Sequence, residues 1–290
     1  MPTVESSAVP VLQTVCHPTD FSPASHTAFA HALTAALIAE AKLTILHVSP
    51  HGGEEWTDFP RVRETLERWG LLPKNSERSA VAKLGIQVEK VQTVHTDPVE
   101  SITAYLDNHN ADLIVLATDQ GKGSIQWLNR SVATGVARKS RQMTLFIPNG
   151  VDGFVSLKDG SISLKHILIP VASDPPPQPA VQAAVRMASR LRCPSGLFTL
   201  LHVGEQGAMP DVRCPDLAGW RWDKVTRSGG VVDVIDQAAR ETRADLIVLC
   251  TEGRNGFLDA LRGSHSERVL RQSPCPVLAV PAGGFIGSVL

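Results

Sequence analysis

The sequence lacks an excess of charge of either sign, and it lacks long apolar runs. Its 28 Lys and Arg residues against 29 Asp and Glu residues give a formal net charge of -1 over 290 residues. Such a chain has no overall field that would attract nucleic acid or an anionic membrane. No segment approaches the ~20 apolar residues of a membrane helix, and residues 1–10 lack the basic and apolar regions of a signal peptide. We therefore expect a cytoplasmic protein with no nucleic-acid or membrane partner.

Cysteine is also scarce, and its spacing excludes the common cysteine-based sites. The five cysteines form no C-x-x-C pair and no Cys/His cluster at zinc spacing; they are Cys16, Cys193, Cys214, Cys250 and Cys275. No metal site is predicted from such a pattern. We expect buried free thiols in a reducing compartment.

The chain contains an internal repeat. The sequence Ala-Asp-Leu-Ile-Val-Leu at residues 111–116 recurs at residues 244–249, an offset of 244 − 111 = 133. Without a gap, the same offset also aligns Gly123 with Gly256, Ser131 with Ser264 and Pro148 with Pro281. A register held over this span indicates two copies of one domain, and 290 residues suit two domains of ordinary size. We place the first domain at residues 1–150, the second at 163–290, and a linker rich in Gly, Ser and Asp at 149–165.

Each copy alternates short Val-, Ile- and Leu-rich runs with helical patterns, which is typical of βαβ units and a buried parallel sheet. The expected strands are residues 12–16, 43–48, 87–94, 113–117 and 144–147 in the first copy, and 167–171, 197–203, 223–227, 246–250 and 277–280 in the second. The fold class is therefore α/β: two tandem repeats, each an open five-stranded parallel sheet with helices on both faces. We expect two separate sheets rather than one continuous sheet.

Further local signals refine this picture. The last strands, 144–147 and 277–280, are apolar edges that would promote aggregation if exposed, so we expect them to cover each other or to be covered by another chain. Ser22 before Pro23 predicts a helix start, and Asp97 to Glu100 predicts a capping box. Residues 54–80 and 205–221 look like loop or helical insertions over the sheet edge.

A glycine pattern follows the fourth strand of the second copy. Cys250-Thr-Glu-Gly253 is followed by nine residues and then by Gly263-Ser264. Glycines let the backbone approach a phosphate closely, and a serine with free amides at a helix N-terminus donates to phosphate oxygens. Gly253, Gly263 and Ser264 are thus candidate phosphate contacts. The same residues also fit a plain turn and helix cap.

This segment resembles the G-x2-G-x9-G-[S/T] motif of the universal stress protein family, with Cys250 in place of the first glycine. The resemblance covers nearly the whole chain except the two insertions. It implies a stress-response protein with a Rossmann-like, adenine nucleotide α-hydrolase-like fold that binds ATP or another adenine nucleotide. It also implies that the two repeats pair within the chain, commonly through antiparallel contact of their last strands. The sequence also leaves open whether two chains form a homodimer.

The resemblance also implies where the nucleotide binds. In the family an Asp after strand one contacts the nucleoside, and hydrophobic strand ends line the adenine pocket. The second copy has Ala172 in place of that Asp, with Asp174 as a substitute in the following loop. Its candidate nucleotide contacts are Val171, Ala172, Asp174, Val203, Cys250, Gly253, Arg254, Gly263, Ser264 and His265. The two valines also fit an ordinary core.

In the first copy, the strand-one residue matches the family and the phosphate motif does not. Asp20 stands at the strand-one position, but all three glycines of the phosphate motif are missing. Gln120 and Arg130 occupy two of these places, and the bulky Arg130 would obstruct a phosphate or replace its charge. We expect the first copy to be a degenerate site.

No residue set suggests a nucleophile with its base, a Walker A lysine or paired carboxylates for Mg²⁺. We therefore expect binding rather than catalysis, and leave weak ATPase activity open. The alternatives are a ligand-independent interaction module with degenerate sites, or a nucleotidyl-transfer enzyme, which the lack of an H-x-G-H motif after strand one disfavours. We expect His17, His47 and His202 to be core or strand-end histidines.

Overall fold

The computed structural model describes residues 12–52, 56–118, 132–133, 135–136, 139, 142–251 and 273–283. The first repeat contains strands β1 (Thr14–Pro18), β2 (Lys42–Ser49), β3 (Gln87–Val94), β4 (Leu113–Thr118) and β5 (Met143–Pro148). The second contains β6 (His166–Val171), β7 (Gly196–Val203), β8 (Trp220–Arg227), β9 (Leu246–Thr251) and β10 (Val277–Pro281). All ten predicted strands are confirmed, with shifts of up to three residues at their ends.

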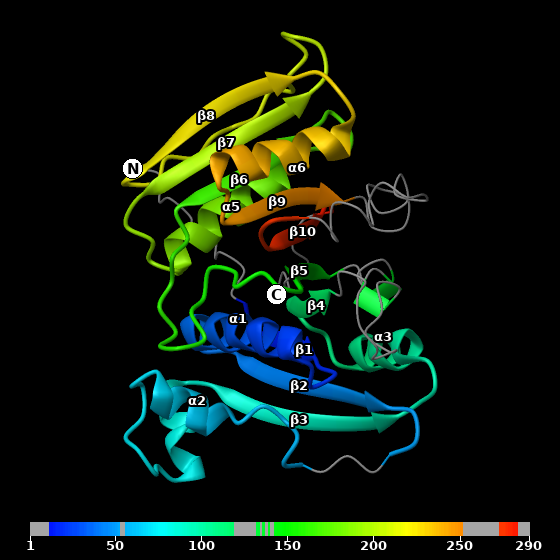
Figure 1. Ribbon diagram of the computed structural model, residues 1–290, viewed down its shortest axis with the longest axis vertical. Helices are drawn as coiled ribbons and strands as arrows, with labels where there is room; N and C mark the ends of the chain where they lie inside the picture. Colours follow the sequence, from blue (N-terminus) through cyan, green and yellow to red (C-terminus); the bar gives the residue numbers. More distant parts are fainter. Residues whose placement is uncertain are drawn as a thin grey trace, which may run out of the picture.

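The ten strands form one sheet in the order β3-β2-β1-β4-β5-β10-β9-β6-β7-β8 (Figure 1). The five strands of each repeat are parallel to one another, and the two sets meet where β5 pairs antiparallel with β10. The five-stranded parallel sheets and the pairing of the last strands are confirmed. The expectation of two separate sheets was wrong, because backbone pairing of the two apolar edges joins them into one.

The junction of the two repeats is symmetric in sequence. The register pairs Leu145 with Leu278, and its neighbours pair Phe146 with Val277 and Thr144 with Ala279. Since the repeat offset of 133 makes Leu145 and Leu278 equivalent residues, the central position of the junction pairs a residue with its own copy. This is the arrangement that a two-fold axis produces in an isologous dimer, here within a single chain.

Helices cover both faces of the sheet, as expected. On one face, α1 (Pro23–Ala39), α2 (Val62–Arg68) and α5 (Gln178–Arg190) contribute to one apolar core. On the other face, α3 (Pro98–Asn108) and α6 (Val231–Thr242) contribute to a second core. Alternate strand residues point into the two cores because the pleat turns successive side chains to opposite faces.

The described residues of both insertions lie on the α1 and α5 face. Residues 54–80 include α2 and the short 3-10 helix η1 (Arg78–Ala80), which is followed by η2 (Ala82–Leu84). They bury Phe59 and Leu66 in the core of this face. In the second repeat, residues 205–219 run without a helix and bury Val212 in the same core. Lys90 of the outer strand β3 lies over the Phe59 ring, and the Trp222 indole of the outer strand β8 donates to the Pro215 carbonyl, so the predicted place over the sheet edge is confirmed for these residues.

The predicted helix start at Ser22 is confirmed. Its hydroxyl oxygen accepts a hydrogen bond from the Ser25 amide at 3.3 Å, and Pro23 is the first helical residue. Proline suits this position because the first amides of a helix have no carbonyl partner within the helix.

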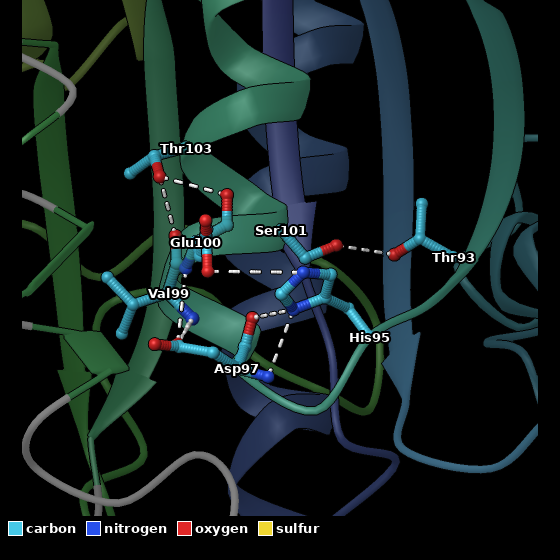
Figure 2. A network of polar contacts seen from close by, with 7 residues as sticks. All are labelled: Thr93, His95, Asp97, Val99, Glu100, Ser101 and Thr103. Carbon is cyan, nitrogen blue, oxygen red and sulfur yellow. Dashed lines mark hydrogen bonds and ion pairs between the residues drawn. The ribbon is translucent and has the colours of Figure 1, made fainter.

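The start of α3 keeps the predicted cap in altered form (Figure 2). Asp97 Oδ1 accepts from the amides of Val99 at 2.8 Å and Glu100 at 3.2 Å. The Asp97 amide donates to His95 Nδ1 at 3.0 Å, whereas Glu100 Oε2 lies 4.0 Å from His95 Nε2. His95 thus performs the reciprocal half of the capping box that the sequence assigns to Glu100.

The segment between β5 and β6 forms a strap over α1. The Phe154 amide donates to His31 Nε2 at 3.1 Å, and the Trp69 indole donates to the Leu157 carbonyl at 3.3 Å. Burial lowers the pKa of His31 to about 4, so its ring is neutral and Nε2 can accept this bond. The strap explains why α1, which lies between it and the sheet, is buried on almost every side.

The two buried histidines His17 and His31 predict how stability depends on pH. Burial lowers the pKa of each to about 4, below the 6.5 of a free histidine. The unfolded chain therefore binds more protons between these values, and the free energy of unfolding falls as the pH drops from 6.5 toward 4. Replacing His31 with Gln should reduce this slope by up to about 1.4 kcal/mol per pH unit, measured by urea unfolding. His26→Gln, at an exposed position, is the control; equal slopes in all three proteins would contradict the prediction.

The junction predicts a second stability effect. Leu278 is fully buried, so Leu278→Ala should lower the free energy of unfolding by about 2–5 kcal/mol. The more exposed Leu157 is the control, and Leu157→Ala should change it by about 0.5 kcal/mol or less. A Leu278→Ala protein as stable as the control in chemical denaturation would show that the β5–β10 junction contributes little.

Candidate functional site

The topology of the second repeat defines one sheet edge where a ligand can bind. Strand β6 lies in the middle of its half-sheet, with β7 and β8 on one side and β9 and β10 on the other. The direction of winding therefore changes between β6 and β9, and ligands of such sheets bind beside the strand ends at this point. Backbone pairing of β6 with β9 covers two residue pairs, of which Leu168 with Ile247 is the nearer to the carboxyl ends.

Five of the predicted contacts lie at this edge. Val171 ends β6, Val203 ends β7 and Cys250 is the second-last residue of β9, while Ala172 and Asp174 directly follow β6. Val171 and Cys250 are buried, Val203 is partly exposed, and Ala172 and Asp174 are exposed. This edge thus combines apolar strand ends with an exposed loop beside them.

The remaining predicted contacts lie outside the described residues. These are the phosphate-loop residues Gly253, Arg254, Gly263, Ser264 and His265. Gln120 and Arg130, which are expected to make the first repeat a degenerate site, also lie outside the described residues. Strand β9 ends at Thr251, at the same edge as Val171 and Val203.

Histidines hold the strand ends, as expected from the sequence. His202 Nδ1 lies 3.1 Å from the Val171 carbonyl oxygen, and the equivalent His47 Nδ1 lies 2.8 Å from the carbonyl oxygen of Thr19. A carbonyl only accepts, so Nδ1 carries the proton in both rings. The two bonds tie the end of the second strand of each repeat to the end of its first strand.

The strand-one aspartate of the first repeat is engaged in its own turn. Asp20 Oδ1 accepts from the Ser22 amide at 3.0 Å and from the Ser25 hydroxyl at 2.8 Å. These bonds shape the loop that leads into α1 and occupy an oxygen that the resemblance assigns to a nucleoside.

An aromatic cluster covers the same edge of the first repeat. Phe21 stacks on His47 with ring centroids 4.1 Å apart, and the edge of Phe59 from the insertion approaches Phe21 at 5.2 Å. Trp56 stacks on Phe59 at 5.3 Å. His47 and Phe59 are 3% and 1% exposed. This cluster could not be predicted from the sequence, because the insertion bears no similarity to the second copy that would indicate where it packs.

The aspartates of the repeated Ala-Asp-Leu-Ile-Val-Leu segment act at the opposite edge. Asp245 Oδ2 accepts from the amides of Lys165 at 2.7 Å and His166 at 2.8 Å. Asp112 Oδ2 accepts in the same way from the amides of Gln13 at 2.7 Å and Thr14 at 2.9 Å. Both carboxylates therefore fix the start of the first strand of their repeat and are structural.

The cysteines only partly meet the expectation of buried thiols. All five are free; Cys16, Cys250 and Cys275 are buried, but Cys193 and Cys214 are partly exposed because they lie in surface loops. Burial raises the pKa of Cys16 and Cys275 to about 12, and it raises the pKa of Cys193 and Cys214 as well. Since the thiolate is the reactive form, all four should be slow nucleophiles.

This difference in access predicts the order of alkylation. With iodoacetamide at pH 8, the partly exposed Cys193 and Cys214 should be modified first, and Cys16 and Cys275 only after denaturant is added. Mass spectrometry of tryptic peptides with time reports each site. Modification of Cys16 in the native protein at the rate of Cys214 would contradict the burial described here.

Two parallel half-sheets, each with its first strand in the middle and helices on both faces, define a tandem Rossmann-like protein. A family model agrees: that of the universal stress protein family matches residues 12–148 and 218–281. The chain belongs to this family.

Comparison with solved structures extends the likeness to more than nine-tenths of the chain. A universal stress protein from Archaeoglobus fulgidus is 19% identical, with a TM-score of 0.59 over 93% of this chain and 98% of that one. A protein from Pseudomonas aeruginosa described as a putative universal stress protein is 13% identical, with a TM-score of 0.53 over 94% of each chain. At such identities the likeness shows the fold.

One curated relative is closer over a short stretch. A universal stress protein of Thermus aquaticus is 40% identical over 60 residues, which is 21% of this chain and 44% of that protein. The match thus spans less than half of the relative's length. In the part of the chain that the structure describes, no helix has the length and apolar character needed to cross a membrane.

Proposed function

We propose that this chain is a stress-response regulator that binds an adenine nucleotide, such as ATP, in its second repeat. The observation that supports it most is the convergence of β6, β7 and β9 at the edge from which the glycine motif departs. A winding change with a Gly- and Ser-containing loop at this edge is the usual position of a nucleotide in parallel α/β sheets.

Different residues of this site suit different parts of the nucleotide. The apolar strand ends Val171 and Val203 suit a purine ring, and Val203 retains exposed surface for it. Gly253, Gly263 and Ser264 supply the close approach and the donors that phosphates need. We assign no residue to catalysis, and the proposed role is regulatory.

The first repeat supports one site per chain. Its strand-one aspartate bonds within its own turn, and its strand-end histidine lies beneath Phe21 and Phe59. A ligand at this edge would have to displace packed aromatic rings. We propose the domain limits 1–150 and 163–290, with the working site in the second domain.

One observation favours a second candidate. Ala172 provides no carboxylate where the family's strand-one aspartate stands, and a damaged site would fit a ligand-independent interaction module. Under that function the paired repeats would present a surface that binds another protein, and no nucleotide would bind.

Calorimetry with ATP on three proteins distinguishes the two candidates. Wild type should bind one nucleotide per chain. Gly263→Val should weaken binding roughly ten- to a hundredfold, because its side chain blocks a phosphate and removes at least one charge-assisted hydrogen bond of about 1.5–3 kcal/mol. Arg130→Gly, the matched change in the first repeat, should leave the affinity of the second repeat unchanged.

Two results would overturn the proposal. Unchanged affinity in Gly263→Val would mean that the nucleotide binds elsewhere. If neither wild type nor Arg130→Gly binds ATP, ADP or AMP, the interaction-module function replaces the nucleotide-binding function.

A further inference from the structure

The two strand-end histidines occupy equivalent places but differ in their surroundings. His47 is 3% exposed beneath Phe21 and Phe59. His202 is partly exposed, and Ser173 stands where the first repeat has Phe21. The same imidazole is therefore sealed in one repeat and accessible in the other.

The orientation of the His202 ring is fixed. Its Nδ1 donates to the Val171 carbonyl oxygen across 3.1 Å, so Nε2 carries the lone pair and is an acceptor. Val171 directly precedes Ala172, the position that lacks the strand-one carboxylate. The ring thus brings an acceptor nitrogen to the strand end where an acceptor oxygen is missing.

Gly204 makes room for this ring. A Cβ added at Gly204 would lie 2.6 Å from His202 Nε2, although the backbone at Gly204 is not in the left-handed region that favours glycine. The absence of a side chain here therefore serves the space around Nε2. The matching residue of the first repeat is Ser49, which is buried and bonds its own loop through the Gly52 amide.

We propose that His202 Nε2 replaces the missing carboxylate and accepts a hydrogen bond from the nucleoside part of the ligand, either a ribose hydroxyl or the adenine amine. The inference rests on the proposed function and extends it to the residue that recognises the nucleoside. A neutral imidazole nitrogen and a carboxylate oxygen are both acceptors, so the exchange preserves the chemistry without a buried charge. The exposed Asp174 is the competing acceptor, and no described bond anchors its side chain.

His202→Asn tests the proposal selectively. Asparagine can keep the donor to the Val171 carbonyl through its side-chain amide but has no group at the place of Nε2. AMP affinity should fall about tenfold or more, as expected for the loss of one hydrogen bond that leaves a ligand donor unpaired. The matched change His47→Asn in the first repeat should leave it unchanged. A loss of affinity in Asp174→Asn without a loss in His202→Asn would assign the acceptor role to Asp174 and refute the role of His202. Gly204→Ala should mimic the loss, because its methyl group displaces the ring.

Three AMP analogues identify the donor. If a ribose hydroxyl donates, the analogue that lacks it, 2′-deoxy-AMP or 3′-deoxy-AMP, should bind wild type and His202→Asn with equal affinity. If the adenine amine donates, purine riboside monophosphate, which lacks the amine, should bind both proteins with equal affinity. As a check independent of folding, the ¹⁵N signal of His202 Nε2, assigned by its loss in His202→Asn, should shift when AMP is added.

The outcomes separate this inference from the proposed function. If Gly263→Val weakens AMP binding but His202→Asn and Gly204→Ala do not, the function stands and the role of His202 is refuted. An Nε2 signal that AMP does not move would refute it as well. If wild type binds no adenine nucleotide, both fail together.

Discussion

The pairing of β5 with β10 is the interaction on which the rest of the structure depends. Each is the last strand of a parallel half-sheet that is apolar on both faces, so either one would expose an unpaired backbone edge if the repeats were apart. Antiparallel pairing satisfies both edges at once and forms one continuous sheet with two cores. It leaves β3 and β8 as the outer strands, where Lys, Glu, Arg and Asp discourage further pairing.

This junction also decides where the candidate sites lie. Each half-sheet keeps its first strand in the middle, so the winding changes at β1 and β4 in one repeat and at β6 and β9 in the other. In both places the backbone pairing covers only two residue pairs, which leaves the strand ends open to side chains or to a ligand. Because an antiparallel pair relates the repeats, their carboxyl edges point in opposite directions along the common sheet.

Most of the fold could be predicted from the sequence because both repeats carry the same local patterns of apolar runs and helix-start residues. The buried runs gave all ten strands, and Ser22 and Asp97 gave two helix starts. The role of the repeated aspartates could not be predicted, since the amides that Asp245 binds lie 79 and 80 residues away in the chain. The aromatic cluster around Phe59 could not be predicted either, since the insertion that carries Phe59 has no similar sequence in the second copy. Val171 and Val203 were predicted as contacts from the family resemblance at strand ends, and they lie at the expected edge, where their role in binding stays a prediction. The sequence alone predicted His202 only as a core or strand-end histidine.

The difference between the two edges follows from how each is stabilised. In the first repeat, the stacked pair of Phe21 and His47 and the edge-to-face pair of Phe21 and Phe59 add about 0.5–1.5 kcal/mol each beyond their buried area, without any ligand. The second repeat has no such aromatic cluster over His202 among its described residues, so a bound ligand would stabilise its edge by an amount that rises with the logarithm of ligand concentration. Since the two halves share one sheet, the sealed repeat gives the open one a rigid neighbour without needing a ligand itself. Under the proposed function, such a chain responds to nucleotide through one edge only, and its response is not divided between two coupled sites.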